Sequence, residues 1–429
     1  MVRMVATDQL APRKHFDPQG HRMGPLGTLA SQGAVVLGVL WVFGAFSELL
    51  LPPSVGLLAL FPMLGALMLA PRTVLMQLPV SFSILGIVAL PVASLAWSID
   101  PGATFINVRS FIPSIVAIVL AAGVLTLRDF TVALLWSIRI AILVTIIALV
   151  LVPSTRYHVI GGVNGEPYPG WHGFFNHKNN MAPFLAMALP TVLIFDKNPL
   201  FKWGSLTLII GLLIGSTSAT GVSGAVFGLI AWYWLRTFQR QQDDRDSTLL
   251  FMASLIGSMA VIGGAVASFA TITSAYGKDT SLSGRTDIWE ASIEALSHRP
   301  LFGYGFGALF WRVKISPETA EIWRHVRFEA SHAHNGALDL ALQIGLVGLL
   351  VFTALWLSTA RSAWSKLDTS PDLAIWVLAV LAGNFVIGLT EDVFFGGWIA
   401  LFAAMKVLLM RRESSLLLPS WRRGIAKWN

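Results

Sequence analysis

The sequence predicts an all-α, polytopic integral membrane protein with about twelve transmembrane helices and a large outer loop between the ninth and the tenth. Three observations support this fold class. Hydrophobic residues make up 55% of the 429 positions and charged residues only 12%, against ~25% charged residues in an ordinary soluble domain. Apolar runs recur along the chain at close to the ~20 residues that cross a bilayer. The basic residues collect on one side of the topology that these runs produce.

Composition also excludes several classes of protein. A chain with so few charges is not a soluble enzyme, a disordered protein or a secreted disulfide scaffold. The sequence contains no Cys, so disulfides, thiolate metal sites and catalytic cysteines are excluded. The formal net charge of +7 suggests nucleic acid only until the charges are located, because Lys and Arg in a membrane protein first report orientation.

The predicted elements follow in order along the chain. Residues 1–32 are polar and rich in Pro and Gly, and we interpret them as a cytoplasmic tail, since they lack the apolar run and cleavage site of a signal peptide. Residues 33–410 form the transmembrane domain, and residues 411–429 form a cytoplasmic C-terminal tail. Within the domain, apolar runs predict spans at 33–51, 55–70, 76–97, 110–127, 131–153, 179–195, 203–217, 219–236, 249–272, 336–360, 373–390 and 394–410.

Charge sets the orientation of these spans. With the N-terminus in the cytoplasm, 20 of the 30 Lys and Arg residues fall on the inner side. Most of the others lie in one long loop, where the positive-inside rule loses force. Both termini are therefore predicted to lie inside.

Two outer segments, 154–178 and 273–335, are longer than simple connectors. The second contains a helix-like stretch, Asp287–His298. Seven of the nine His residues fall in these two loops: His158, His172, His177, His298, His325, His332 and His334. Polar chemistry is thus concentrated on the outer face.

The first candidate cluster lies where the loop 154–178 meets the sixth span, and reads GWHGFFNHKNN over residues 170–180. Lys178, with His177 beside it, can form an anion site together with the amides of a helix start. The alternative is an interfacial belt of Trp, His and Lys.

The second cluster reads SLSGRTDIW over residues 281–289. Ser283 can cap a helix whose first turn holds Arg285, followed by Trp289. Arg is the residue best suited to bidentate phosphate recognition. The alternative is an ordinary capped surface helix in which Arg285 pairs with a neighbouring carboxylate.

The third cluster reads SHAHNGALD over residues 331–339 and opens the tenth span. A His beside a helix N-terminus tends to stay neutral, and a neutral imidazole can accept a proton from a hydroxyl. Two alternatives stay open for His332 and His334: a pair of interfacial histidines, or a zinc site completed by a carboxylate. The zinc site lacks the i, i+4 spacing of a helical metal pair.

The fourth cluster is Glu391–Asp392, in the tight turn between the last two spans. Carboxylates this close to hydrocarbon usually have a partner or a function, and Arg285 or a His is the candidate partner. The alternative is a solvated turn.

Together and in this order, the clusters resemble the O-antigen ligase and O-antigen/exopolysaccharide polymerase superfamily of bacterial membrane glycosyltransferases. The resemblance covers roughly residues 160–400. It depends on GFFNHKN at 173–179, STSATG at 216–221, SGRTDIW at 283–289, PLFGYG at 300–305, HAHNGAL at 332–338 and GLVG at 345–348. The twelve-span architecture of that family, with its large outer loop, agrees with the span count.

The resemblance implies an inverting glycosyltransferase in the bacterial inner membrane, with its active site facing the periplasm. We expect it to need no cofactor and no metal, because pyrophosphate is already a good leaving group and fixed cations can stabilise its developing charge. Its donor would be a saccharide on undecaprenyl pyrophosphate. Arg285 would bind the pyrophosphate and His334 would act as the general base. The expected substrate-binding residues are Lys178, His177, Asn335, His332, Trp289, Glu391 and Asp392.

One position departs from the family pattern. The family usually has a second Arg in a Ser-Arg-small sequence between the seventh and eighth spans, where this chain has Ser218-Ala219-Thr220. Lys178 is the cation expected to substitute for it, as a point charge without bidentate geometry.

Ligase and polymerase differ in their acceptor, which is lipid A–core for the ligase and another lipid-linked repeat unit for the polymerase. The His177-Lys178-Asn179 motif and the hairpin at 216–220 favour a polymerase of exopolysaccharide or O-antigen units. A transporter or flippase of lipid-linked saccharide is the second alternative. The few charges inside the spans and the lack of paired broken helices disfavour it.

Overall fold

The computed structural model describes residues 24–45, 57–69, 81–158, 168–240, 285–311, 313–394 and 396–411. This part of the chain is helical apart from loops and one short antiparallel ladder, so the predicted all-α class is confirmed. The α-helices are α1 (Pro25–Val42), α2 (Leu60–Leu69), α4 (Phe82–Ala93), α5 (Pro101–Val124), α6 (Leu127–Leu151), α7 (Lys178–Phe195), α8 (Pro199–Ser216), α9 (Ala219–Arg240), α11 (Arg285–His298), α12 (Pro317–Val326), α13 (Gly336–Trp364), α14 (Pro371–Gly388) and α15 (Gly397–Met410). The ladder pairs β1 (Tyr157–His158) with β2 (Tyr168–Pro169), and the 3₁₀ helices are η4 (Ser94–Ala96) and η5 (Pro153–Arg156).

The apolar helices make the chain a multi-pass membrane protein. In the described part, six helices are long and apolar enough to cross a bilayer, namely α1, α5, α6, α8, α13 and α14, and three shorter apolar helices accompany them. Eleven of the twelve predicted segments overlap a described helix. The ninth, 249–272, lies outside the described residues, so the count of twelve stays a prediction.

Small residues let three helices, α7, α9 and α14, pack closely together. A Cβ on Gly383 of α14 would lie 2.6 Å from the carbonyl oxygen of Gly224 on α9, and a Cβ on Gly221 would lie 2.2 Å from Ala182 on α7. Close backbone approach at small residues is the usual way in which membrane helices associate. The contact fixes the hairpin between α8 and α9 against the start of α7.

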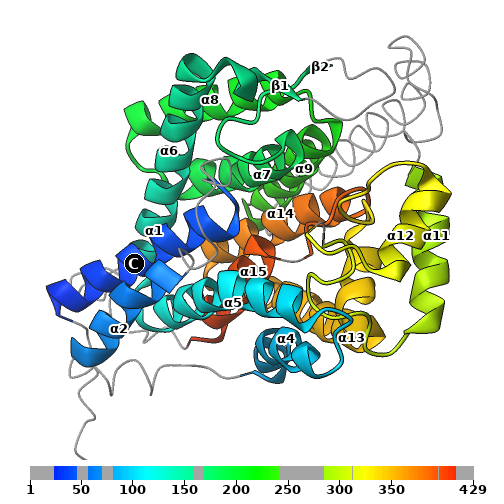
Figure 1. The fold of residues 1–429 in the computed structure, drawn as a ribbon. Coiled ribbons are helices and arrows are strands. Elements are labelled where there is room, and N and C mark those ends of the chain that lie inside the picture. Colours follow the sequence, from blue (N-terminus) through cyan, green and yellow to red (C-terminus); the bar gives the residue numbers. More distant parts are fainter. Residues whose placement is uncertain are drawn as a thin grey trace, which may run out of the picture.

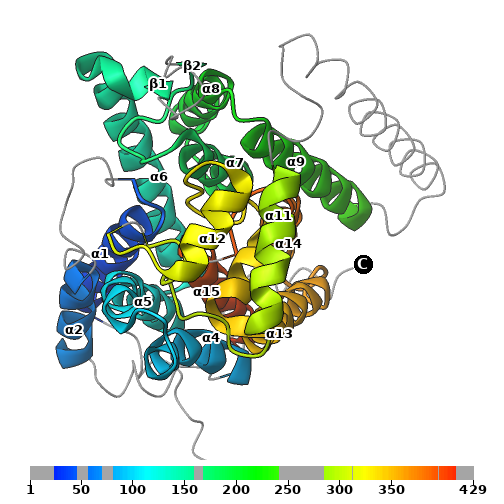
Figure 2. The same ribbon diagram turned by 45° about the vertical axis from the view of Figure 1, so that its right-hand side comes forward.

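The described part of the outer segment begins at Arg285 and lies at one side of the helical bundle, where α11 packs against α12 and α13. Figures 1 and 2 show α11 and α12 as a separate pair beside the ends of α13 and α14. The predicted helix-like stretch Asp287–His298 is confirmed, because α11 runs from Arg285 to His298. Ser283, the expected cap, lies outside the described residues.

Two sequence motifs of the resemblance meet where α13 is interrupted. Gly345 has φ 72° and breaks the helical geometry inside α13. The segment after α11 uses the break: Leu346 donates its N–H to the carbonyl of Pro300 (2.8 Å), and Tyr304 donates its N–H to the carbonyl of Leu342 (2.8 Å). The PLFGYG and GLVG motifs therefore anchor the outer segment to α13.

Candidate active site

One buried carboxylate joins three of the predicted clusters. The Oε1 atom of Glu391 accepts hydrogen bonds from Arg285 Nη2 (2.8 Å) and from Asn179 Nδ2 (2.7 Å). Its Oε2 atom lies 3.4 Å from Nδ1 of His334. The first turn of α7, the start of α11 and the turn before α13 thus meet at Glu391.

The turn after α14 places this carboxylate. Glu391 donates its N–H to the carbonyl of Ile387 at the end of α14 (3.0 Å). The ring of Phe394 fills the space beside it, where a Cβ on Gly336 would lie 2.9 Å from the ring and one on Gly388 2.2 Å. Glycine at both positions therefore lets the turn close over the N-terminus of α13, with Glu391 beneath it.

The two neighbouring carboxylates differ in their electrostatics. Burial by itself raises the pKa of Glu391, but His334, His332 and Arg285 together hold that pKa below its ordinary value, so Glu391 is an anion. Burial and the charge of Glu391 raise the pKa of Asp392 to about 6. Glu391 is therefore the permanent counter-charge of the cluster.

The network continues from Asn179 into the hairpin between α8 and α9. Ser218 donates its Oγ hydrogen to Oδ1 of Asn179 (2.9 Å), and the buried Lys178 donates from Nζ to Oγ1 of Thr217 (3.1 Å). Thr217 lies in the left-handed region, with φ 50°. Gly170 leaves room for the Lys178 side chain, because a Cβ there would lie 2.8 Å from its Cδ.

Lys178 therefore reaches the hairpin that departs from the family pattern. Its ammonium bonds Thr217, directly before Ser218-Ala219. The cation expected to substitute for the missing Arg thus lies beside the position where that Arg would stand.

The His-containing turn is clamped from two sides. Ala333 donates its N–H to Oδ1 of Asp339 on α13 (3.0 Å), and its carbonyl accepts from Nε1 of Trp289 on α11 (3.1 Å). The next residue, His334, has φ 49°, a conformation that non-glycine residues seldom adopt and that recurs at functional sites. Its ring lies 4.0 Å from that of His332, measured between centroids.

The two histidines are not equivalent. The N–H of His334 donates to Nδ1 of His332 (3.1 Å). Burial, and then the positive charge that His334 can carry, lower the pKa of His332 to about 4, so His332 is neutral at pH 7. A neutral imidazole whose Nδ1 accepts a bond carries its proton on Nε2. His332 is therefore a hydrogen-bond donor at Nε2.

Comparison with known proteins bears on the family of the chain. A protein-family profile described as O-Antigen ligase matches residues 204–353, which include Arg285 and His334. The exopolysaccharide production protein ExoQ of Rhizobium meliloti (strain 1021) is 23% identical in an alignment of length 352, which covers 77% of this chain and 77% of the relative. Both support the O-antigen ligase and polymerase family. This is the family that the sequence motifs predicted.

The zinc alternative for His332 and His334 has a geometric basis. The ligand atoms of His332, His334 and Glu391 all lie within 4.8 Å of one another, and three protein ligands suffice for a catalytic zinc site. Glu391, however, already accepts bonds from Arg285 and Asn179, and a guanidinium at 2.8 Å repels a divalent cation. The arrangement therefore favours the ion pair over a metal centre.

Two of the expected substrate-binding residues cap helices. His177 accepts the N–H of Asn179 at Nδ1 (3.0 Å) and begins α7. Asn335 accepts the N–H of Leu338 at Oδ1 (3.0 Å) and donates from Nδ2 to the carbonyl of Leu389 (3.3 Å). By capping these helices, the two side chains fix the starts of α7 and α13. They thereby also position Lys178, which follows His177, and His334, which precedes Asn335.

Two residues of the site were missing from the sequence-based set. Asn179 and Asp339 both lie inside quoted motifs, yet neither was assigned a function. Their positions in the sequence could have indicated a function. Each polar side chain falls in the first turn of a buried apolar helix, where an unsatisfied polar group is costly.

A large cavity of about 620 Å³ adjoins the cluster. It is lined by residues of α1, α5, α7 and α13, by the segment 306–311 and by the turn 392–398. His332, Asn179 and Asp392 lie in its wall, so it is continuous with the candidate site.

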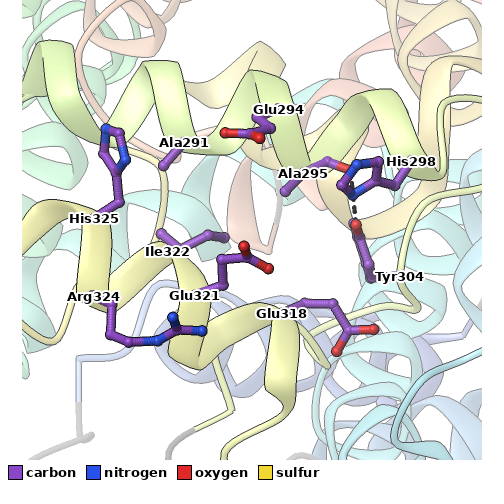
Figure 3. Close-up of a pocket in the computed structure, with 10 residues that line it drawn as sticks. All are labelled: Ala291, Glu294, Ala295, His298, Tyr304, Glu318, Glu321, Ile322, Arg324 and His325. Atoms are coloured by element: carbon purple, nitrogen blue, oxygen red, sulfur yellow. Dashed lines mark hydrogen bonds between the residues drawn. The ribbon is translucent and has the colours of Figure 1, made fainter.

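A second, smaller pocket of about 290 Å³ lies between α11 and α12. Figure 3 shows Glu294 of α11 and Glu321 of α12 extending into the space between these helices. Tyr304 closes one end and donates its hydroxyl to the carbonyl of Ala295 (2.7 Å). None of the residues that line this pocket belongs to the Glu391 network, so we do not place the reaction there.

Proposed function

We propose that the chain is an inverting, metal-independent membrane glycosyltransferase that transfers a saccharide from undecaprenyl pyrophosphate to a saccharide acceptor on the periplasmic face. The observation that carries the proposal is the shared carboxylate of Glu391, which binds Arg285 and faces His334. One cation for a leaving phosphate and one base for an attacking hydroxyl are thereby held by the same group.

Arg285 and Lys178 are the groups proposed for the pyrophosphate. Glu391 takes one N–H of the Arg285 guanidinium and sets its plane, and the other N–H donors of a guanidinium suit phosphate oxygens. Lys178, on the neighbouring helix, supplies a second positive charge at the hairpin. Fixed cations in a poorly hydrated site stabilise the charge that develops on a leaving pyrophosphate.

His334 is the proposed general base. A proton on Nδ1 facing Glu391 leaves Nε2 free to accept the proton of the acceptor hydroxyl. The acceptor oxygen then forms a bond to the anomeric carbon while the bond from that carbon to the pyrophosphate oxygen breaks. Attack opposite the leaving group inverts the anomeric centre, and undecaprenyl pyrophosphate leaves with the bonding electrons.

Polymerisation of repeat units is the favoured form of this reaction. The name of the Rhizobium relative refers to exopolysaccharide production, in which the acceptor would be another lipid-linked repeat. The matching profile is described as O-Antigen ligase, and this favours the second candidate, transfer to lipid A–core.

The direct test is transfer by the purified full chain in lipid nanodiscs, with undecaprenyl-pyrophosphate saccharide as donor. We expect a longer lipid-linked saccharide, in the presence or absence of EDTA, and no product from Arg285→Ala. Product on lipid A–core instead would identify a ligase. Loss of product with EDTA and recovery with Zn²⁺ would overturn the metal-independent reaction.

The periplasmic placement has its own test, since the chain has no Cys. Val313 is 83% exposed in the outer segment, and Lys197, with a side chain 78% exposed, lies in the predicted inner hairpin. Val313→Cys should react with a membrane-impermeant thiol reagent in spheroplasts, and Lys197→Cys should not. The reverse labelling would contradict the orientation.

A further inference from the structure

We infer that the cavity of about 620 Å³ beside Glu391 is the acceptor subsite, and that it selects uncharged sugar residues. The inference rests on the proposed transfer reaction and specifies the chemistry of its acceptor. Its volume falls in the range of small-molecule pockets, roughly 300–1,000 Å³, which is far more than a proton path or a metal ion needs.

The polar groups of the wall match sugar hydroxyls. Five amide side chains line the cavity: Asn107, Asn176, Asn179, Asn180 and Gln343. An amide presents both a donor and an acceptor, as a hydroxyl does. Asn179 and Gln343 already bond groups of the protein, which fixes both side chains, but an amide nitrogen has a second hydrogen and an amide oxygen a second lone pair. Together with Asn180, they suit a ligand that carries many hydroxyls and no net charge.

The apolar part of the wall is aromatic. Trp41, Trp311 and Trp398 line the cavity together with Phe residues. The indole of Trp41 donates its N–H to the carbonyl of Ser110 (2.8 Å), which fixes that ring. Flat rings beside amides suit the sugar ring, which has apolar C–H faces and a polar edge.

The charge of the wall disfavours an anion. Two carboxylates, Asp339 and Asp392, line the cavity, and none of the described residues that line it is Lys or Arg. The pyrophosphate therefore belongs with Arg285 and Lys178, outside this wall. A uronic acid or another acidic sugar would bring a like charge close to these carboxylates.

Hydrogen bonds also connect the wall of the cavity to the segment that carries the proposed base, His334. Gln343 donates from Nε2 to Oδ2 of Asp339 (2.6 Å) and accepts the N–H of Gly307 at Oε1 (3.0 Å). The other oxygen of Asp339 holds Ala333, the residue before His334. A sugar seated against this wall would thus lie at a fixed distance from the base, as attack on the donor requires.

Asn180 and Trp311 are the best positions for a test, because both line the cavity and neither belongs to the Glu391 network. Asn180→Ala and Trp311→Ala should raise the KM for the acceptor roughly tenfold, the equivalent of one lost contact, with the KM for the donor unchanged. Trp311→Phe keeps a ring and should stay near wild type. Size-exclusion profiles of all variants check folding.

The selectivity is tested with two probes: a trisaccharide of neutral hexoses, and the same trisaccharide with one hexose replaced by its hexuronate. In competition with the acceptor, the neutral probe should inhibit the wild type about tenfold better. Asn180→Arg should reverse that order, because it adds a cation to the wall. Equal inhibition by both probes, or a raised donor KM in Asn180→Ala, would overturn the inference.

The same probes separate this inference from the proposed reaction. Neutral-probe binding, followed by quenching of Trp fluorescence, should persist in Arg285→Ala although transfer is lost. Transfer by the wild type without any probe binding would refute the subsite and leave the reaction standing. Probe binding without transfer would refute the reaction alone.

Discussion

Of the three Arg–carboxylate pairs in the part of the chain that the structure describes, two are alike in distance and burial. Arg139 Nη2 lies 2.6 Å from Oδ2 of Asp196, with side chains 20% and 4% exposed. Arg285 Nη2 lies 2.8 Å from Oε1 of Glu391, with side chains 19% and 2% exposed. Distance and burial therefore do not distinguish a structural pair from a functional one.

The surroundings of the pairs do distinguish them. The guanidinium of Arg139 lies over the rings of Trp136 (5.3 Å) and Phe201 (4.8 Å), and Asp196 otherwise accepts the N–H of Asn198 within its own turn (3.2 Å). Both side chains of that pair are thus surrounded by neighbouring groups of the protein, and the pair joins α6 to the end of α7. Glu391, in contrast, is shared with an amide and an imidazole beside a cavity. We propose that this sharing of the carboxylate is what distinguishes the active site from the structural pair.

The largest expected effect comes from removing the shared charge. Glu391→Gln keeps the side-chain shape, but both the base and the cation lose their anchor, so the transfer rate should fall about 10⁴-fold. Asp196→Asn is the matched control and should keep its rate per folded molecule. Measured rates in nanodiscs, corrected for folded protein, check both. Similar losses in the two variants would remove the distinction between the pairs.

Removal of the base should have the next largest effect. His334→Ala should lose about 10³-fold in kcat while still binding donor, because general bases contribute ~10²–10⁴-fold. His332→Ala should cause a smaller loss of kcat, since Nε2 of His332 carries a proton and cannot accept one. If His332→Ala is the inactive variant, the two assignments must be exchanged.

The third effect depends on the shape of a cation. Arg285→Lys keeps the charge but loses the planar fork, and each charge-assisted bond is worth ~1.5–3 kcal/mol, so kcat/KM should fall roughly 10–100-fold. Arg139→Lys should keep kcat/KM, because an ammonium can also lie over aromatic rings. Near-wild-type rates for both Arg285→Lys and Arg285→Ala would show that Arg285 only begins α11.

The smallest effect concerns stability and pH. The pKa of Asp392 is raised to about 6 by burial and by Glu391, above the ~3.9 of an unfolded Asp. Its contribution to stability is therefore present below about pH 4 and is lost as the pH rises through about 6. Asp392→Asn should match the wild type in thermal unfolding at pH 4 and exceed it at pH 7. Asp196→Asn should lower stability at pH 7, because it leaves Arg139 without its carboxylate.

Sequence patterns could predict which segments meet but not how their atoms pair. The order of the motifs placed Arg285, His334 and Glu391–Asp392 on one outer face. The choice between the two adjacent carboxylates depends on the turn after α14, where the N–H of Glu391 bonds Ile387. No periodicity encodes that turn, and a shift of one residue would exchange the buried and the half-buried side chain.

Backbone conformation was the other unpredictable part. The left-handed φ angles of Thr217 and His334 occur at residue types that give no signal, unlike the glycine at Gly345. Even there the apolar pattern runs through the break in α13, so the sequence predicted a continuous span at 336–360. The contact of Lys178 with Thr217 and the clamp on Ala333 depend on these local turns.

The central claim is that Glu391 acts through His334, and a double-mutant cycle tests it most directly. Transfer rates of wild type, Glu391→Gln, His334→Ala and the double variant are measured at saturating acceptor in one nanodisc preparation. If the pair acts as a unit, the double variant should be no slower than the slower single variant, within about threefold. Losses that multiply would show that Glu391 and His334 act independently and would contradict the account.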